Sequence, residues 1–159
     1  MPEQFFPVHP AEVRKLAEEC YRTGQFSCSE AIVKTINEAF ALGYPDSIIA
    51  VTSGFPIGIG GAGCARGAVT GGVMALGMAS GRSKPRDPSV DRCLALAREL
   101  PDLFFRRHGY TSCRVLTRGM VLKSPEHLQQ CVAFAGGVAE ETAKIIIREM
   151  NTPAGRAIT

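Results

Sequence analysis

Residues 54–81 decide the fold of this chain, and they read GFPIGIGGAGCARGAVTGGVMALGMASG. The stretch holds 10 of the 17 glycines and a single charged residue, Arg66. We expect a tight backbone loop over 54–63, because glycine adopts turn conformations that other residues avoid. A helix follows over 65–80, and its side chains are so small that neighbouring elements can approach its backbone closely.

The interior glycines oppose this predicted helix. Each of Gly67, Gly71, Gly72 and Gly77 costs about 1 kcal/mol of helix propensity relative to alanine. Contact with other helices, a dimer interface or a cofactor lying against the helix must offset that cost. We expect no membrane span, because the apolar run after Arg66 is about 15 residues long, whereas a span needs about 20.

Capping and stop signals predict six more helices around this stretch. A proline opens the first, Ser27-Cys28-Ser29-Glu30 forms a capping box, and Gly109 is a stop signal. We expect helices over 9–23, 27–40, 45–53, 87–109, 112–118 and 124–150, with a kink or break at Pro101. The sequence therefore predicts an all-α fold of about six to seven helices in a single domain, 1–159, with a frayed tail beyond residue 152.

Composition excludes several classes of protein. The chain of 159 residues is 45% hydrophobic and 21% charged, which is typical of a globular protein and not of a disordered or fibrous one. The net charge of +3 is scattered along the chain, so no nucleic-acid partner is expected. The N-terminal residues lack a basic region followed by an apolar one, so we predict no signal peptide and a cytoplasmic location.

Six cysteines are the most informative feature of the composition, because cytoplasmic thiols are kept reduced and serve more often as ligands or redox groups than as disulfides. Cys28, Cys64 and Cys113 fall at predicted helix starts, where the helix dipole favours thiolate over thiol. Cys131 lies one helical turn after His127, so their side chains share a face. Cys20 and Cys93 lie on apolar stripes and are predicted to be core residues.

The missing motifs narrow the chemistry further. No C-x-x-C and no H-E-x-x-H occurs, and without C-x-x-C-H we expect no c-type haem. Residues 58–63 match the G-x-G-x-x-G dinucleotide pattern, but no strand precedes them, so we do not favour a nucleotide site. Any metal or cluster site must therefore be assembled from distant helices.

The run over 63–77, GCARGAVTGGVMALG, resembles the signature of the redox-active family described by the pattern C_GCAxxG_C_C. Cys28, Cys64, Cys113 and Cys131 match its four cysteines in order, and the resemblance covers about residues 10–145. The chain is also similar to the module of split-Soret cytochromes, without their haem-carrying sequence. The resemblance implies a helical redox protein, a homodimer that works beside an electron-transfer or transport partner.

Our leading hypothesis is a redox centre in which Cys28, Cys64, Cys113 and Cys131 bind an iron–sulfur cluster or another thiolate-bound metal. His127 is a further candidate ligand if only three thiolates converge. The candidate cofactor-contacting residues of the glycine loop are Gly60, Gly61, Gly63, Arg66 and Gly67.

Two other hypotheses remain open. One is a metal-free thiol–disulfide enzyme or sensor, in which Cys64 attacks and Cys113 or Cys28 resolves the mixed disulfide. The other is a structural or interaction subunit whose glycine-rich helix is a dimer face.

Overall fold

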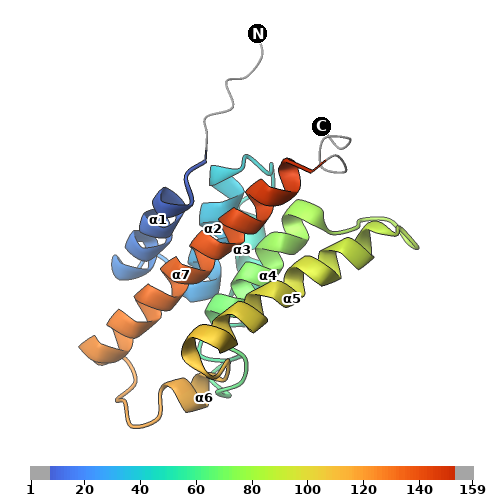
Figure 1. Cartoon of the computed structure of the whole chain (residues 1–159). Coiled ribbons are helices and arrows are strands. Elements are labelled where there is room, and N and C mark those ends of the chain that lie inside the picture. The colour runs from blue at the N-terminus through green and yellow to red at the C-terminus, as the bar shows by residue number, and fades with distance from the viewer. Residues whose placement is uncertain (1–7, 153–159) are drawn as a thin grey trace.

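Seven helices and no strand occur in residues 8–152, the part of the chain that the structure, a computed structural model, describes (Figure 1). The all-α prediction is confirmed. The helices are α1 (Pro10–Arg22), α2 (Cys28–Ala39), α3 (Ser47–Thr52), α4 (Gly67–Ser80), α5 (Ser89–His108), α6 (Cys113–Leu116) and α7 (Pro125–Met150). The predicted frayed tail lies outside the described residues. Within 8–152 we find no helix with the length and apolarity to cross a membrane.

Helix ends follow the predicted signals. Ser27 forms a capping box with Glu30, whose carboxylate accepts the Ser27 backbone N–H at 2.9 Å. At the start of α7, Ser124 Oγ accepts the backbone N–H of His127 at 3.2 Å. Gly109 ends α5 in the left-handed conformation, with a φ of 79°. These contacts occupy backbone groups that have no partner inside the helix.

The sequence predicts a kink or a break at Pro101, and no break occurs, since α5 continues through this residue to His108. A proline inside a helix removes one backbone hydrogen bond and crowds the preceding turn. Here Leu96, Leu100 and Phe104 are buried on either side of the proline and belong to the hydrophobic core. Their burial holds the helix together where local propensity opposes it.

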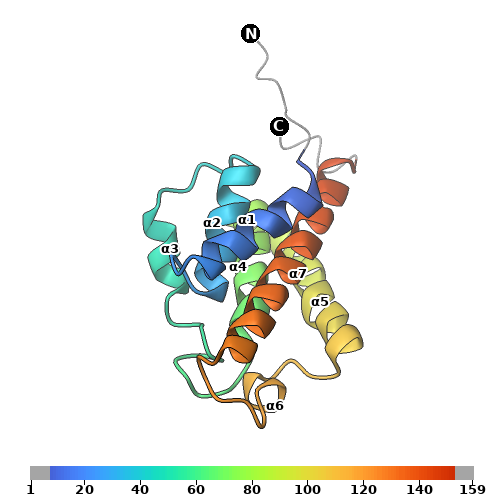
Figure 2. The ribbon, with the colours of Figure 1, turned by 90° about the vertical axis from the view of Figure 1, so that its left-hand side faces the viewer.

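The glycine-rich helix α4 lies between α2, α5 and α7 (Figures 1 and 2), and its first turn begins at Gly67, two residues later than predicted. A Cβ atom added at Gly71 would lie 2.7 Å from the Cα atom of Ser29 on α2. One added at Gly72 would lie 2.7 Å from side-chain carbons of Leu100 and Val138, on α5 and α7. Contact between helices therefore explains these two glycines.

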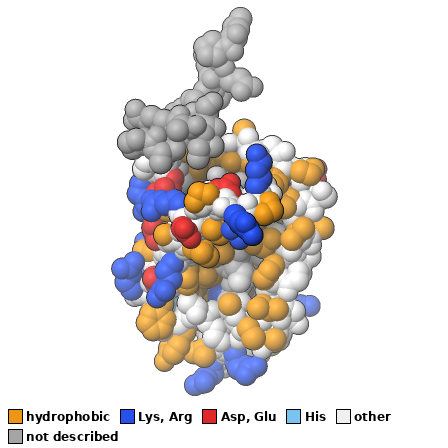
Figure 3. Space-filling model, turned by 90° about the vertical axis from the view of Figure 1, so that its right-hand side faces the viewer, with side chains coloured by type: hydrophobic (Ala, Val, Ile, Leu, Met, Phe, Trp, Pro, Cys, Tyr) orange, Lys and Arg blue, Asp and Glu red, His pale blue; other side chains and the backbone are white. Residues whose placement is uncertain are grey.

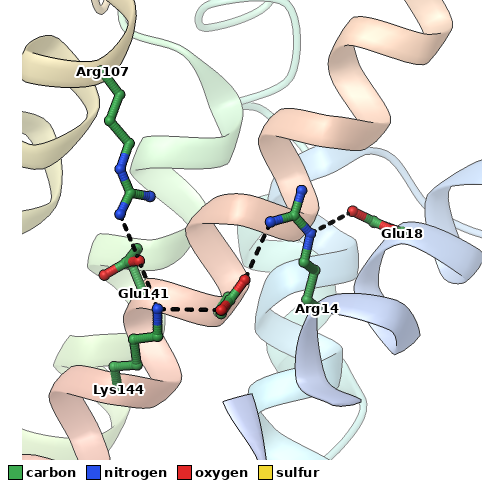
Figure 4. Close-up of polar contacts among 6 residues, drawn as sticks. Arg14, Glu18, Arg107, Glu141 and Lys144 are labelled. Atoms are coloured by element: carbon green, nitrogen blue, oxygen red, sulfur yellow. Dashed lines mark hydrogen bonds and ion pairs between the residues drawn. The ribbon is translucent and has the colours of Figure 1, made fainter. Parts of the chain in front are cut away.

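Ion pairs connect the long helix α7 with α1 and α5 (Figure 4). Arg14 on α1 contacts Glu18 at 2.9 Å and Glu140 on α7 at 3.2 Å. Arg107 on α5 contacts Glu141 on α7 at 2.9 Å, and Lys144 contacts the same carboxylate at 3.1 Å. Each such surface pair contributes about 0–1 kcal/mol, so the network fixes the orientation of the helices more than it stabilises them.

The loop between α3 and α4 runs down to α6 and pairs with the residues before it (Figure 2). Ala65 and Ser112 form an isolated antiparallel bridge. The backbone N–H of Cys113 donates to the carbonyl of Cys64 at 2.8 Å, and that of Arg66 donates to the carbonyl of Thr111 at 2.9 Å. This pairing fixes the start of α6 against the residues just before α4.

Backbone strain is concentrated in the same loop. All five residues from 57 to 61 have positive φ, and two of them are the β-branched residues Ile57 and Ile59, with φ of 57° and 63°. This region is unfavourable for such side chains. The hydrogen bond from the Cys64 backbone N–H to the Gly58 carbonyl, at 2.9 Å, helps to hold this conformation.

We predict opposite effects on stability for two glycine-to-alanine substitutions in α4. G71A places a methyl group against the backbone of Ser29, which cannot move aside, and should lower the free energy of unfolding by about 1–3 kcal/mol. G77A is the matched control, because nothing lies within 4 Å of the added Cβ. It should raise the free energy of unfolding by about 0.5–1 kcal/mol. Urea denaturation followed by circular dichroism measures both, and equal effects would contradict the packing described here.

Candidate functional site

A cavity of about 590 Å³ opens at the end of the molecule where α1, α2, α7 and the glycine loop meet α6. Three of the four cysteines matched by the sequence pattern line it, namely Cys28, Cys113 and Cys131. The other lining residues are Tyr21, Gly24, Phe26, Ser27, Pro56, Ile57, Arg66, Gly67, Lys123, His127 and Leu128. None of the lining residues is an aspartate or a glutamate, so the cavity is cationic.

Helix starts position two of the three sulfurs. Cys28 is the first residue of α2, directly after the Ser27 cap, and Cys113 is the first residue of α6. Gly67 at the start of α4 lies against Cys28, since an added Cβ would be 2.5 Å from the sulfur. Cys131 comes from the second turn of α7. The three thiols therefore belong to three separate helices.

Arg66 is the central residue of the cavity. Its side chain is only 3% exposed, and its guanidinium lies over the ring of Phe134, 4.4 Å from the centroid. Nη2 donates to Cys131 Sγ at 3.0 Å, and Nη1 lies 3.5 Å from Cys113 Sγ. No carboxylate within residues 8–152 forms an ion pair with this buried cation. A buried charge is costly unless other groups compensate it, and here the two sulfurs and the Phe134 ring contact the guanidinium.

His127 adds a second donor to Cys131. Its Nδ1 accepts the backbone N–H of Lys123 at 3.1 Å, which leaves the proton of the neutral imidazole on Nε2. Nε2 lies 3.5 Å from Cys131 Sγ, so this N–H points to the sulfur. The pKa of His127 is lowered by burial and then by Arg66, which keeps the ring neutral near pH 7. Cys131 thus faces two N–H donors, an arrangement suited to a sulfur that carries negative charge.

Burial overrides the helix dipole at the other two thiols. Burial raises the pKa of Cys28 to about 11, although the backbone N–H of Ser29 opposes the shift. The pKa of Cys113 is also raised by burial, against the opposing charge of Arg66. The expectation that these helix starts favour thiolate is therefore wrong for the protein without a bound ligand. The phenol of Tyr21 has a raised pKa, first because of burial and then because of the charges on Cys131 and Cys28.

Cys64 does not line the cavity, and its side chain is exposed on the glycine loop. It lies three residues before α4 and not at its first turn, and only its backbone contacts Cys113. Arg66 and Gly67 reach the cavity, whereas the other three candidate cofactor-contacting glycines lie outside its lining: Gly60, Gly61 and Gly63. Cys20 is buried as predicted, but Cys93 is only half-buried on α5 and lies outside the core.

Among the ionisable residues that line the cavity, sequence reasoning missed Tyr21 and Lys123, and it did not foresee that Arg66 would contact the cysteines. One signal pointed to Arg66, since it is the only charge in 28 residues of small and apolar side chains. Nothing in the sequence distinguishes Tyr21 from an ordinary residue at the end of a helix. In residues 8–152 no three His, Cys, Asp or Glu side chains form a group that could hold a metal ion as they stand.

The fold and the site together define a small all-helical protein with a buried, cationic, multi-cysteine cavity. The sequence model of the family described as "Putative redox-active protein (C_GCAxxG_C_C)" matches residues 26–145. The chain belongs to this family. Comparison with curated proteins and with solved structures found no match.

We predict that the cysteines differ strongly in their rates of alkylation. At pH 8 only about 0.1% of a thiol with a pKa near 11 is ionised, so iodoacetamide should modify Cys28 at least about tenfold more slowly than the exposed Cys64. The rate at Cys28 should then rise about tenfold per pH unit up to pH 10. Peptide mass spectrometry measures both rates, with unfolded protein as the control for equal access. Equal rates in the folded protein would contradict the burial described here.

Proposed function

We propose that this protein transfers electrons through an iron–sulfur cluster, or another thiolate-bound metal, held by Cys28, Cys113 and Cys131. The observation that carries the proposal is the convergence of three thiols, from three separate helices, on one cavity that also contains a buried guanidinium. When bound, such a cluster accepts and releases one electron at a time. Membership of a family described as redox-active agrees with this function.

The chemistry of the donor set fits such a group. Thiolates are soft ligands that select iron–sulfur clusters and thiophilic metals. A cluster with thiolate ligands is anionic, and Arg66 supplies a buried positive charge beside two of the sulfurs. The thiols do not close around a single point, and the cavity of about 590 Å³ is large. The size of the cavity favours a group of several atoms over a single ion.

The fourth ligand has two candidates in this chain. His127 is one candidate, because its Nε2 lies 3.5 Å from the sulfur of Cys131. Cys64 belongs to the sequence pattern, and its carbonyl is bonded to the first residue of α6. For Cys64 to serve as a ligand, its side chain must turn inward from the surface of the strained loop.

The residues around the centre have separate tasks. Arg66 neutralises charge and donates hydrogen bonds to sulfur, while Phe134 keeps its guanidinium in place from the opposite side. Tyr21 and the start of α2 line the cavity on the side of α1, close to Cys28. Exclusion of water and hydrogen bonds to sulfur are the means by which a protein sets the potential of such a centre.

A second function is favoured by one observation, the single guanidinium that contacts both Cys113 and Cys131. These two thiols could form a disulfide, with two electrons passing to an acceptor disulfide and two protons leaving the sulfurs. The raised pKa of Cys113 counts against it, because a protonated thiol is a poor nucleophile. We therefore rank this thiol–disulfide function below the metal centre.

The homodimer expected from the resemblance remains a prediction. α4 is covered by α2, α5 and α7 of the same chain, so the tight glycine contacts at Gly71 and Gly72 are made within one molecule. These two glycines therefore give no support to a dimer face on α4.

We predict that anaerobic reconstitution with iron and sulfide gives a coloured protein, and that C28S, C113S and C131S each lose most of its iron, sulfide and visible absorption. C93S is the matched control and should retain them, because Cys93 lies on α5 outside the cavity. C64S and H127A test the two candidates for the fourth ligand, and the variant that loses metal identifies that ligand. A wild-type protein that stays colourless after reconstitution, with a Cys113–Cys131 disulfide on mild oxidation, would contradict the metal centre and favour the second function.

We also predict that R66M lowers the reduction potential of the reconstituted centre. Removal of a positive charge several ångström away makes the uptake of an electron less favourable, by on the order of 100 mV at an effective dielectric constant of about 20. R66K keeps the charge but cannot contact both sulfurs, so its potential should lie between the other two. Redox titration followed by electron paramagnetic resonance measures the reduction potentials of the three proteins. An unchanged potential in R66M would show that Arg66 does not act on the centre.

A further inference from the structure

Two long segments that reach the end of the molecule with the cavity contain no Asp or Glu, and the exposed Glu126 lies just beyond the second of them, at the start of α7. Between Asp102 and Glu126 the chain contains five Lys or Arg residues and no Asp or Glu. Residues 47–86, which include the glycine loop, likewise contain no acid. Figure 3 shows hydrophobic and basic side chains, and no acidic ones, over the lowest part of one face, the end where Figure 1 places α6. This end of a protein with a net charge of only +3 therefore carries more basic than acidic side chains.

Within residues 8–152, two exposed cations at this end, Arg118 and Lys123, are unpaired. On the helical body most exposed cations form ion pairs, as Arg92 does with Glu149 and Arg148 does with Glu99. In the part of the chain that the structure describes, Arg118 and Lys123 are exposed and belong to no ion pair. Unpaired charges of one sign create a field that attracts and orients an oppositely charged partner.

Apolar side chains are exposed among these cations. Val121 is 75% exposed, Leu122 53% and Leu128 41%, and Ile57 on the glycine loop is 40% exposed. Ile57, Lys123 and Leu128 also line the mouth of the cavity. We call the surface formed by Ile57, Arg118, Val121, Leu122, Lys123 and Leu128 the docking face. An apolar centre with charged neighbours is the usual composition of a transient protein interface.

We propose that an acidic electron-carrier protein docks on this face, over the mouth of the cysteine cavity. The charge of the face selects an acidic partner, and its exposed aliphatic side chains favour a protein surface over a nucleic acid, whose phosphates need cations and offer no apolar contact. In the complex one electron leaves the carrier, which is oxidised, and enters the cysteine centre, which is reduced, with no bond formed or broken. The role of the partner rests on the proposed function, but its binding can be measured without any metal.

The test is a binding titration of the full chain with two purified acidic carriers, a ferredoxin and a flavodoxin, followed by amide chemical shifts. We expect shifts on the docking face, and binding that weakens at least about tenfold between roughly 20 and 200 mM salt. R118E/K123E should weaken binding about tenfold or more at low salt. K84E/R86E is the matched control, because it reverses one exposed lysine and one exposed arginine in the α4–α5 connection and should leave the affinity within about twofold.

Any one of four outcomes would overturn the proposal. Neither carrier binds at low salt, or both charge-reversed variants lose affinity equally, or the shifts lie away from the docking face. Binding to vesicles of phosphatidylglycerol, through the same residues and without binding to either carrier, would instead identify a membrane surface and also overturn it. Iron and sulfide analysis of the same samples keeps the two proposals separate, because docking can persist in a protein that binds no metal.

Discussion

The burial of one guanidinium between two cysteine sulfurs is the constraint on which the rest of this structure depends. Arg66 has no carboxylate partner, so its position must be fixed by the chain itself. Its backbone N–H is bonded to Thr111 and its carbonyl accepts the N–H of Thr70 in the first turn of α4. The side chain is then held between Phe134 and the sulfurs. The loop, α4, α6 and α7 all contribute to placing a single charge.

Glycine makes this placement possible. The start of α4 can approach the start of α2 only because Gly67 and Gly71 have no side chain, and this contact determines where Cys28 lies. In the preceding loop, Ile57 and Ile59 adopt a left-handed backbone conformation that is normally occupied by glycine. Hydrogen bonds within the loop, such as that from the Cys64 N–H to the Gly58 carbonyl, hold the chain in this strained path toward α4.

The sequence allowed the helices to be predicted well, because caps and stops such as Ser27, Ser124 and Gly109 are local signals. At Pro101 the helix does not break, because it is held together by the burial of neighbouring side chains, which a local signal does not contain. Three of the four pattern cysteines meet in one cavity. The spacing of a pattern does not reveal which way a loop residue points, and Cys64 faces outward. The thiolate expectation failed because a helix dipole can be inferred from sequence, whereas desolvation requires the fold.

The cavity also imposes an order on biosynthesis. Cys28 and Cys131 are 131 − 28 = 103 positions apart, and α7 follows every other described helix in the chain. A ribosome therefore releases α1, α2 and the glycine loop before the residues that complete the cavity exist. During translation Arg66 has neither Cys113 nor Cys131 beside it, and the early thiols are open to solvent. The three thiols of the cavity can therefore meet only after α7 has been synthesised.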